Sequence, residues 1–67
     1  MERLGEFVYN GDGATLENGV SYTLFETNSQ IEAYPEGSGE PVEINKGGVF
    51  NSLQENLESL GGATPMG

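Results

Sequence analysis

The residues with the clearest chemical potential lie together in the stretch YNGDGATLENG, residues 9–19. Oxygen-bearing side chains at alternate positions, with a glycine at the sharp turn, are typical of calcium loops. Asn10 and Asp12 suit the first two ligand positions, but Ala14 has no side-chain oxygen for the third. Glu17 is also not at the spacing of the closing ligand. We therefore expect a plain loop here and no metal site.

The same stretch begins like a phosphate-binding fingerprint. Gly11 and Gly13 match the first two glycines of G-x-G-x-x-G, but Leu16 stands at the third. No long helix follows to direct its N-terminus at a phosphate, and the nearby acids would repel an anion. We interpret the stretch as two turns, in which Asn18-Gly19 suits a backbone with φ > 0 and Leu16 holds the loop against the core.

Catalytic chemistry has few candidates, because the chain contains neither histidine nor cysteine. The hydroxyls of Ser21, Thr23 and Ser29 have no imidazole to activate them as nucleophiles. Glu32 and Glu43 could act as an acid–base pair if their strands were neighbours, since facing carboxylates can share a proton. Glutamates on the solvent face of a sheet are far commoner. We therefore expect neither an enzyme nor a cofactor.

The charge balance limits the choice of partners. Eleven acids and two bases, Arg3 and Lys46, give a formal net charge of −9. This charge opposes direct binding to nucleic acid and to anionic membranes. One interpretation of the acids is ordinary solubility, which we favour. The alternative is mimicry of DNA, in which carboxylates imitate phosphates and occupy a basic protein groove.

The bulk sequence features indicate one small domain. No apolar run approaches the roughly 20 residues that span a bilayer. The first residues, MERLGEFVY, lack the apolar segment of a signal peptide, so we expect a cytoplasmic protein. The length favours one domain over residues 1–60 and a flexible tail over residues 61–67.

Four segments alternate between apolar and polar residues as strands do, namely residues 6–9, 20–26, 30–34 and 42–44. In the second segment, Tyr22 and Leu24 share one face and Phe25 lies on the other. Phe25 is therefore either a second layer of core or an exposed contact residue, and core packing is favoured.

The apolar period changes near the C-terminus, where residues recur every three or four positions: Phe50, Leu53, Leu57 and Leu60. This stripe predicts an amphipathic helix over residues 53–60. Ser52 with Glu55 has the pattern of a capping box, Asn51 is a rival cap, and Gly61 suits the stop position. The stripe either packs on the core, which we favour, or contacts a partner.

The segment around the second strand supports a family comparison. Leu16, Gly19, Tyr22 and Leu24 form the pattern L-x-x-G-x-x-Y-x-L. The chain resembles, from about Phe7 to Phe50, the small Src-homology-3-like barrels of bacteria and phages. There a leucine leads into a diverging turn, a glycine makes the turn and a tyrosine opens the next strand.

This resemblance implies a mainly β fold, a small Src-homology-3-like barrel of about five short strands, here with a short C-terminal α-helix. It also suggests a phage or mobile-element origin, and then the host cytoplasm as the location. The tandem aromatic motif of members that bind proline-rich peptides is absent.

Exposed aromatics among acids, placed on loops and strand faces, are typical of interaction surfaces. The candidate contact residues are Tyr9, Asp12, Glu32, Tyr34, Glu36 and Glu43. We expect a non-catalytic binding or structural module whose partner is a protein with a basic surface. The alternatives are an inhibitor that mimics nucleic acid or blocks a host enzyme, and an oligomerising subunit of a larger assembly such as a virion.

Overall fold

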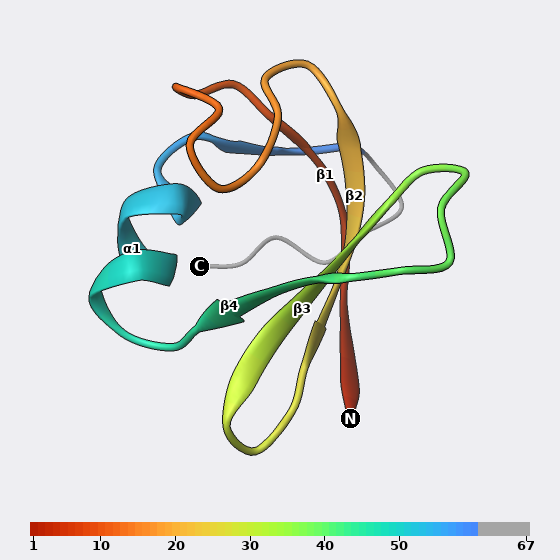
Figure 1. Ribbon diagram of the computed structural model, residues 1–67, viewed down its shortest axis with the longest axis vertical. Coiled ribbons are helices and arrows are strands. Elements are labelled where there is room, and N and C mark those ends of the chain that lie inside the picture. Colours follow the sequence, from red (N-terminus) through yellow and green to blue (C-terminus); the bar gives the residue numbers. More distant parts are fainter. Residues whose placement is uncertain (61–67) are drawn as a thin grey trace.

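The computed structural model describes residues 1–60 and consists of one antiparallel sheet of five strands and one short helix (Figure 1). In chain order the elements are β1 (Glu2–Tyr9), β2 (Ser21–Glu26), β3 (Gln30–Pro35), β4 (Val42–Asn45), α1 (Gly48–Gln54) and β5 (Leu57–Ser59). The strand order in the sheet is β4-β3-β2-β1-β5. The prediction of a mainly β fold with about five short strands is confirmed.

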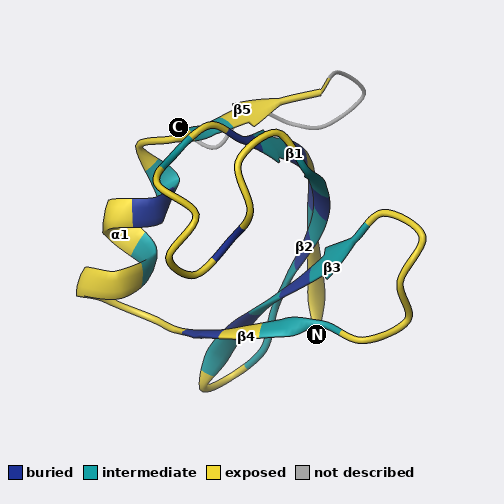
Figure 2. Cartoon of the chain, turned by 45° about the horizontal axis from the view of Figure 1, so that its top comes forward, coloured by how far each residue is buried: buried dark blue, intermediate teal, exposed yellow. Residues whose placement is uncertain are grey.

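The sheet curves around the core without closing into a barrel. β4 and β5 form its two edges and lie on opposite sides of the core, with α1 between them at the open side (Figures 1 and 2). β1 to β4 form successive antiparallel pairs, and β5 returns to pair with β1.

One face of each long strand supplies the core, as the alternation predicts. Buried and half-buried residues alternate along β2 and β3 (Figure 2). The buried cluster consists of Phe7, Tyr9, Leu16, Tyr22, Leu24, Ile31, Ala33, Ile44 and Leu53. The prediction that Tyr22 and Leu24 share one face of the second strand is therefore confirmed.

A bulge in β1 changes the register near the N-terminus. Arg3 pairs with Phe25 and Gly5 pairs with Leu24, so Leu4 is the extra residue between them. Gly5 is buried and has a φ of 134°, a backbone conformation that side chains with a Cβ rarely adopt. The bulge lets Leu4 pack against the core while Arg3 remains exposed.

The predicted C-terminal helix over residues 53–60 is wrong in its position. The helix is α1, which ends at Gln54, and residues 57–59 form β5 beside β1. An isolated two-turn helix is marginal, whereas β5 gains ladder hydrogen bonds with β1. Of the apolar stripe, Leu53 is buried and Leu60 is 45% exposed.

The expected helix cap is also wrong. Gly47 is the N-cap, no side chain caps the helix, and Ser52 lies inside α1. The position predicted as the stop residue, Gly61, and the predicted tail lie outside the described residues.

The loop between β1 and β2, residues 10–20, packs onto the core. Leu16 has no exposed surface, which confirms its predicted role. The Glu17 amide donates a hydrogen bond of 2.8 Å to the Tyr22 hydroxyl. Gly19 has a φ of 83°, as the third residue of a type II turn requires, and the Val20 amide donates to the Glu17 carbonyl at 3.3 Å.

Gly11, in the same loop, is needed because the Tyr9 side chain leaves no space for a Cβ there. A Cβ built on Gly11 would overlap the ring and hydroxyl of Tyr9. The Tyr9 hydroxyl donates to Asp12 Oδ1 at 3.4 Å, and the same oxygen accepts the Ala14 amide at 3.0 Å. Gly11 is therefore the residue that lets the loop cover the Tyr9 ring.

Candidate functional site

The side of the sheet turned away from the core, called the outer face here, carries aromatic and acidic side chains. Phe25 and Tyr34 are both half-buried, and their ring centroids lie 5.5 Å apart at an interplanar angle of 85°. This edge-to-face geometry is favourable for aromatic pairs. The outer face comprises Arg3, Glu6, Val8, Ser21, Thr23, Phe25, Gln30, Glu32, Tyr34, Glu43, Asn45 and Glu58.

Three of these residues form a row across the sheet. Glu6 on β1 pairs with Thr23 on β2, and Thr23 pairs with Tyr34 on β3. The small threonine between two long side chains leaves a hollow. A groove of about 280 Å³ lies there, lined also by Ser21, Pro35 and Glu36 among others.

A second row places two acids side by side. Glu32 on β3 pairs directly with Glu43 on β4, so the two strands are neighbours and their carboxylates lie on the same face. Like charges at such a position are destabilising by themselves. The side-chain nitrogen Nε2 of Gln30 donates a hydrogen bond to Glu32 Oε2 at 3.4 Å. The arrangement adds negative charge beside the aromatic pair.

Of the chain's two bases, Arg3 lies on the outer face and Lys46 directly follows β4. Lys46 Nζ lies 3.0 Å from Glu26 Oε2, which partly neutralises both groups at one end of β2. Arg3 pairs with Phe25 across β1 and β2. Neither base lines the groove beside Tyr34.

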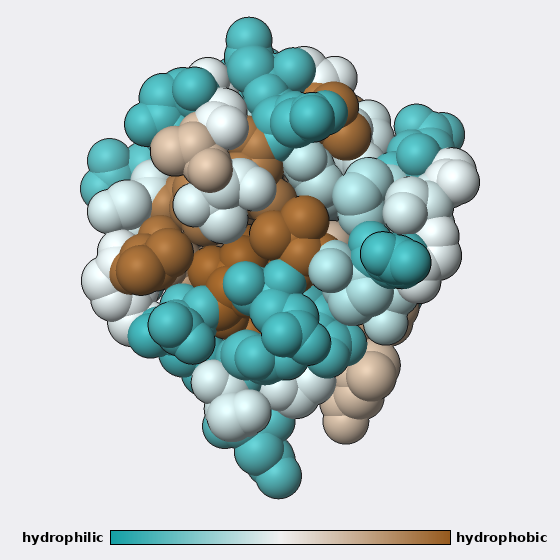
Figure 3. All heavy atoms as spheres, viewed as in Figure 1, coloured by the Kyte–Doolittle hydropathy of each residue, from teal (hydrophilic) through white to brown (hydrophobic). Residues whose placement is uncertain are grey.

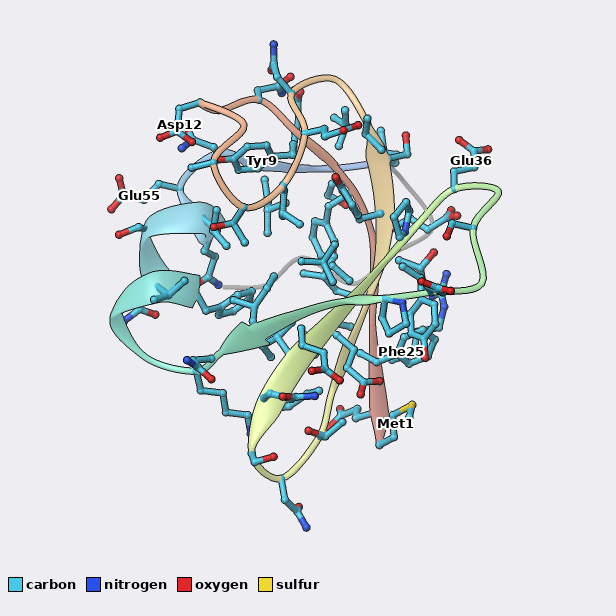
Figure 4. The ribbon with its side chains drawn as sticks, viewed as in Figure 1. Met1, Tyr9, Asp12, Phe25, Glu36 and Glu55 are labelled. Carbon is cyan, nitrogen blue, oxygen red and sulfur yellow. The ribbon has the colours of Figure 1, made fainter. Side chains whose placement is uncertain are left out.

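The predicted contact residues fall on two separate surfaces. Tyr34, Glu32 and Glu43 lie on the outer face, and Glu36 follows at the end of β3. Figure 4 shows Asp12 on the opposite side of the molecule from Phe25 and Glu36. Asp12 is exposed in the β1–β2 loop, where its carboxylate accepts a hydrogen bond from the Ala14 amide.

Two sequence interpretations need correction. Tyr9 is only 2% exposed, so its ring is not available as a contact residue. The reason is its register, since it continues the buried face of β1 after Phe7. The expected core packing of Phe25 is also wrong, because its face of β2 points outward. The alternation with Leu24 was the signal that placed Phe25 with Thr23.

A second hollow of about 230 Å³ lies between the β1–β2 loop and α1. Tyr9, Asp12, Val49 and Leu53 contribute to its lining, and Val49 is 49% exposed. Figure 3 shows hydrophobic residues reaching the surface on this side of the molecule. Asp12 is the one acid among the lining residues, so this hollow offers less charge than the outer face.

Residues 1–60 contain no group of three or more acids arranged to hold a metal ion. Within the same residues, no helix has the length and hydropathy needed to cross a membrane. Comparison with protein-family models, curated proteins and solved structures found no match to this chain.

Proposed function

We propose that this protein is a non-catalytic binding module whose outer face contacts a basic surface of a partner protein. The observation that carries the proposal is the Phe25–Tyr34 pair on the solvent side of the sheet, with Glu6, Glu32 and Glu43 around it. Protein interfaces favour aromatic residues at their centre and polar residues at their rim. Neither Phe25 nor Tyr34 belongs to the buried core, so packing inside the domain does not explain their pairing.

The net charge of −9 supports the same kind of partner. A negative surface speeds the diffusional encounter with a positive one and disfavours acidic competitors. Besides the acids of the outer face, Asp12 and Glu17 lie exposed in the β1–β2 loop and Glu55 lies at the end of α1, so the charge is not confined to one face. This spread gives less support to mimicry of nucleic acid, which requires acids concentrated along one face.

We also propose a likeness to the Src-homology-3-like family, based on the β1–β2 loop and the start of β2. Leu16 is buried, Gly19 has a positive φ, and Tyr22 lies near the start of β2. These positions support the proposed likeness to Src-homology-3-like proteins of bacteria and phages. The cytoplasm, of the host if the protein is phage-encoded, is the proposed location.

An NMR titration of the 15N-labelled protein with a short Lys/Arg-rich peptide tests the binding proposal. We expect the largest amide shifts at Thr23, Phe25 and Tyr34, and weaker binding as salt is raised. Phe25→Thr should weaken binding and leave the strand intact, since threonine also favours strands. Val49→Thr is the matched control, because it removes an exposed apolar group from α1.

Two results would contradict the proposal. One is the absence of saturable shifts at low salt. The other is equal weakening by Phe25→Thr and Val49→Thr, which would mean that the peptide binds only through the overall negative charge and not at the outer face. Sedimentation of the free protein separates the assembly alternative, because a structural subunit should oligomerise whereas the proposed module should remain monomeric without its partner.

A further inference from the structure

We propose that the groove beside Tyr34 binds the side chain of an arginine from a basic segment of the partner. This inference rests on the proposed function and names the chemistry of its central contact. The floor of the groove is formed by two small hydroxyl residues, Ser21 and Thr23, on β2. Tyr34 stands on one side and Glu6 on the other.

The register sets the width of the groove. Glu6, Thr23 and Tyr34 occupy directly opposed positions on three adjacent strands. Neighbouring strands are about 4.8 Å apart, so the backbones that carry Glu6 and Tyr34 are separated by about 10 Å. The volume of about 280 Å³ lies just below the range of pockets for drug-sized molecules, about 300–1,000 Å³. A single long side chain suits this space better than a metabolite does.

The charge of the lining selects a cation. Glu6 and Glu36 both line the groove, and both are exposed. Neither Arg3 nor Lys46 is among the lining residues, so no base of the chain competes for these carboxylates there. Hydroxyl oxygens of Ser21 and Thr23 can accept further hydrogen bonds from the ligand.

The aromatic wall selects arginine over lysine. A guanidinium is planar, stacks on aromatic rings and directs several N–H groups at carboxylates, whereas an ammonium is compact and more strongly hydrated. The Tyr34 ring lines the groove, where a guanidinium can stack on it. Its contact with Phe25, at 5.5 Å and 85°, holds the ring in place before the ligand arrives. Such preorganisation lowers the entropic cost of binding.

The test compares two peptides of equal charge and length, one with arginine and one with lysine at every basic position. Affinities are measured by fluorescence anisotropy, and NMR shifts locate the site. We expect the arginine peptide to bind about 3- to 10-fold more tightly, since guanidinium adds stacking to charge. The shifts of Thr23 and Tyr34 should be larger with arginine.

Two charge-matched variants locate the contact. Glu6→Gln removes one acid from the groove, and Glu17→Gln removes one exposed acid from the β1–β2 loop. We expect Glu6→Gln to weaken the arginine peptide about 5-fold and Glu17→Gln less than about 2-fold, because only the first loses a charge-assisted hydrogen bond. Near-ultraviolet circular dichroism confirms that both variants are folded.

The outcomes separate this inference from the proposed function. Equal affinities for the two peptides, or equal effects of the two variants, would overturn the arginine site, whereas binding at the outer face would still stand. If neither peptide shifts the outer-face amides, both the site and the proposed function fail.

Discussion

Replacing Leu16 with alanine tests whether the β1–β2 loop is part of the core. Leu16 is completely buried. Removing its side chain beyond Cβ loses about 2–2.5 kcal/mol of transfer free energy, at about 0.8 kcal/mol per carbon. The cavity left behind adds to this loss, and buried Leu→Ala changes cost about 2–5 kcal/mol. A chain of 67 residues has a total stability of about 3–10 kcal/mol. The variant should therefore lose a large share of it.

Urea unfolding followed by circular dichroism measures this loss. We expect Leu16→Ala to reduce the free energy of unfolding by about 2–4 kcal/mol and to lower the melting temperature by about 10–25 °C. Thr15→Ala is the control, because Thr15 is the exposed neighbour and its loss should stay within about 0.5 kcal/mol. A loss below about 1 kcal/mol for Leu16→Ala would refute the packing of this loop, since a buried leucine costs more.

Three further measurements test the same loop and the charge. Gly11→Ala should destabilise the protein by about 1–3 kcal/mol in urea unfolding, because its Cβ would overlap Tyr9, as in an overpacked core. Gly39→Ala is the control and should change the stability very little, because no atom lies near the position of its Cβ. Tyr22→Phe should cost about 1 kcal/mol and speed hydrogen exchange of the Glu17 amide, since that amide loses its acceptor; unchanged exchange would contradict this. Raising sodium chloride from about 0.01 M to 0.15 M should raise the melting temperature, because shorter screening lengths reduce self-repulsion at a net charge of −9; a fall would contradict it.

The strands were the part of the fold that could be predicted from sequence. A residue alternation of period two places Tyr22 and Leu24 inside and Thr23 outside without knowledge of any partner strand. The same rule places Phe25 outside. The prediction of core packing for Phe25 gave more weight to its aromatic character than to its position, and the position decided the outcome.

The C-terminal region could not be predicted in the same way. Leu53 and Leu57 are spaced like neighbours on a helix, yet α1 ends between them and Leu57 enters β5. The choice depends on a partner strand far away in the sequence, since Leu57 pairs with Tyr9. Local periodicity contains no information about such a partner, and tertiary pairing overrides a weak helix preference.

Only part of the candidate site could be predicted from the sequence. Tyr34, Glu32 and Glu43 could be assigned to an outward face by alternation, but the groove depends on register. Glu6 and Tyr34 are 28 positions apart and meet across Thr23 only because β1 and β3 flank β2 in this alignment. A shift of one residue would turn these side chains toward the core.

The pairing of β5 with β1 has a consequence for the order of folding. The pairs from β1 to β4 join strands that are consecutive in the chain, whereas β5 must find β1 across almost the whole described length. Distant contacts form late because loop-closure entropy must be overcome first. We therefore expect β5 to dock last and to detach first. Leu60, directly after β5, donates its amide to the Glu6 carbonyl at 3.0 Å, so one wall of the groove then depends on the final step of folding.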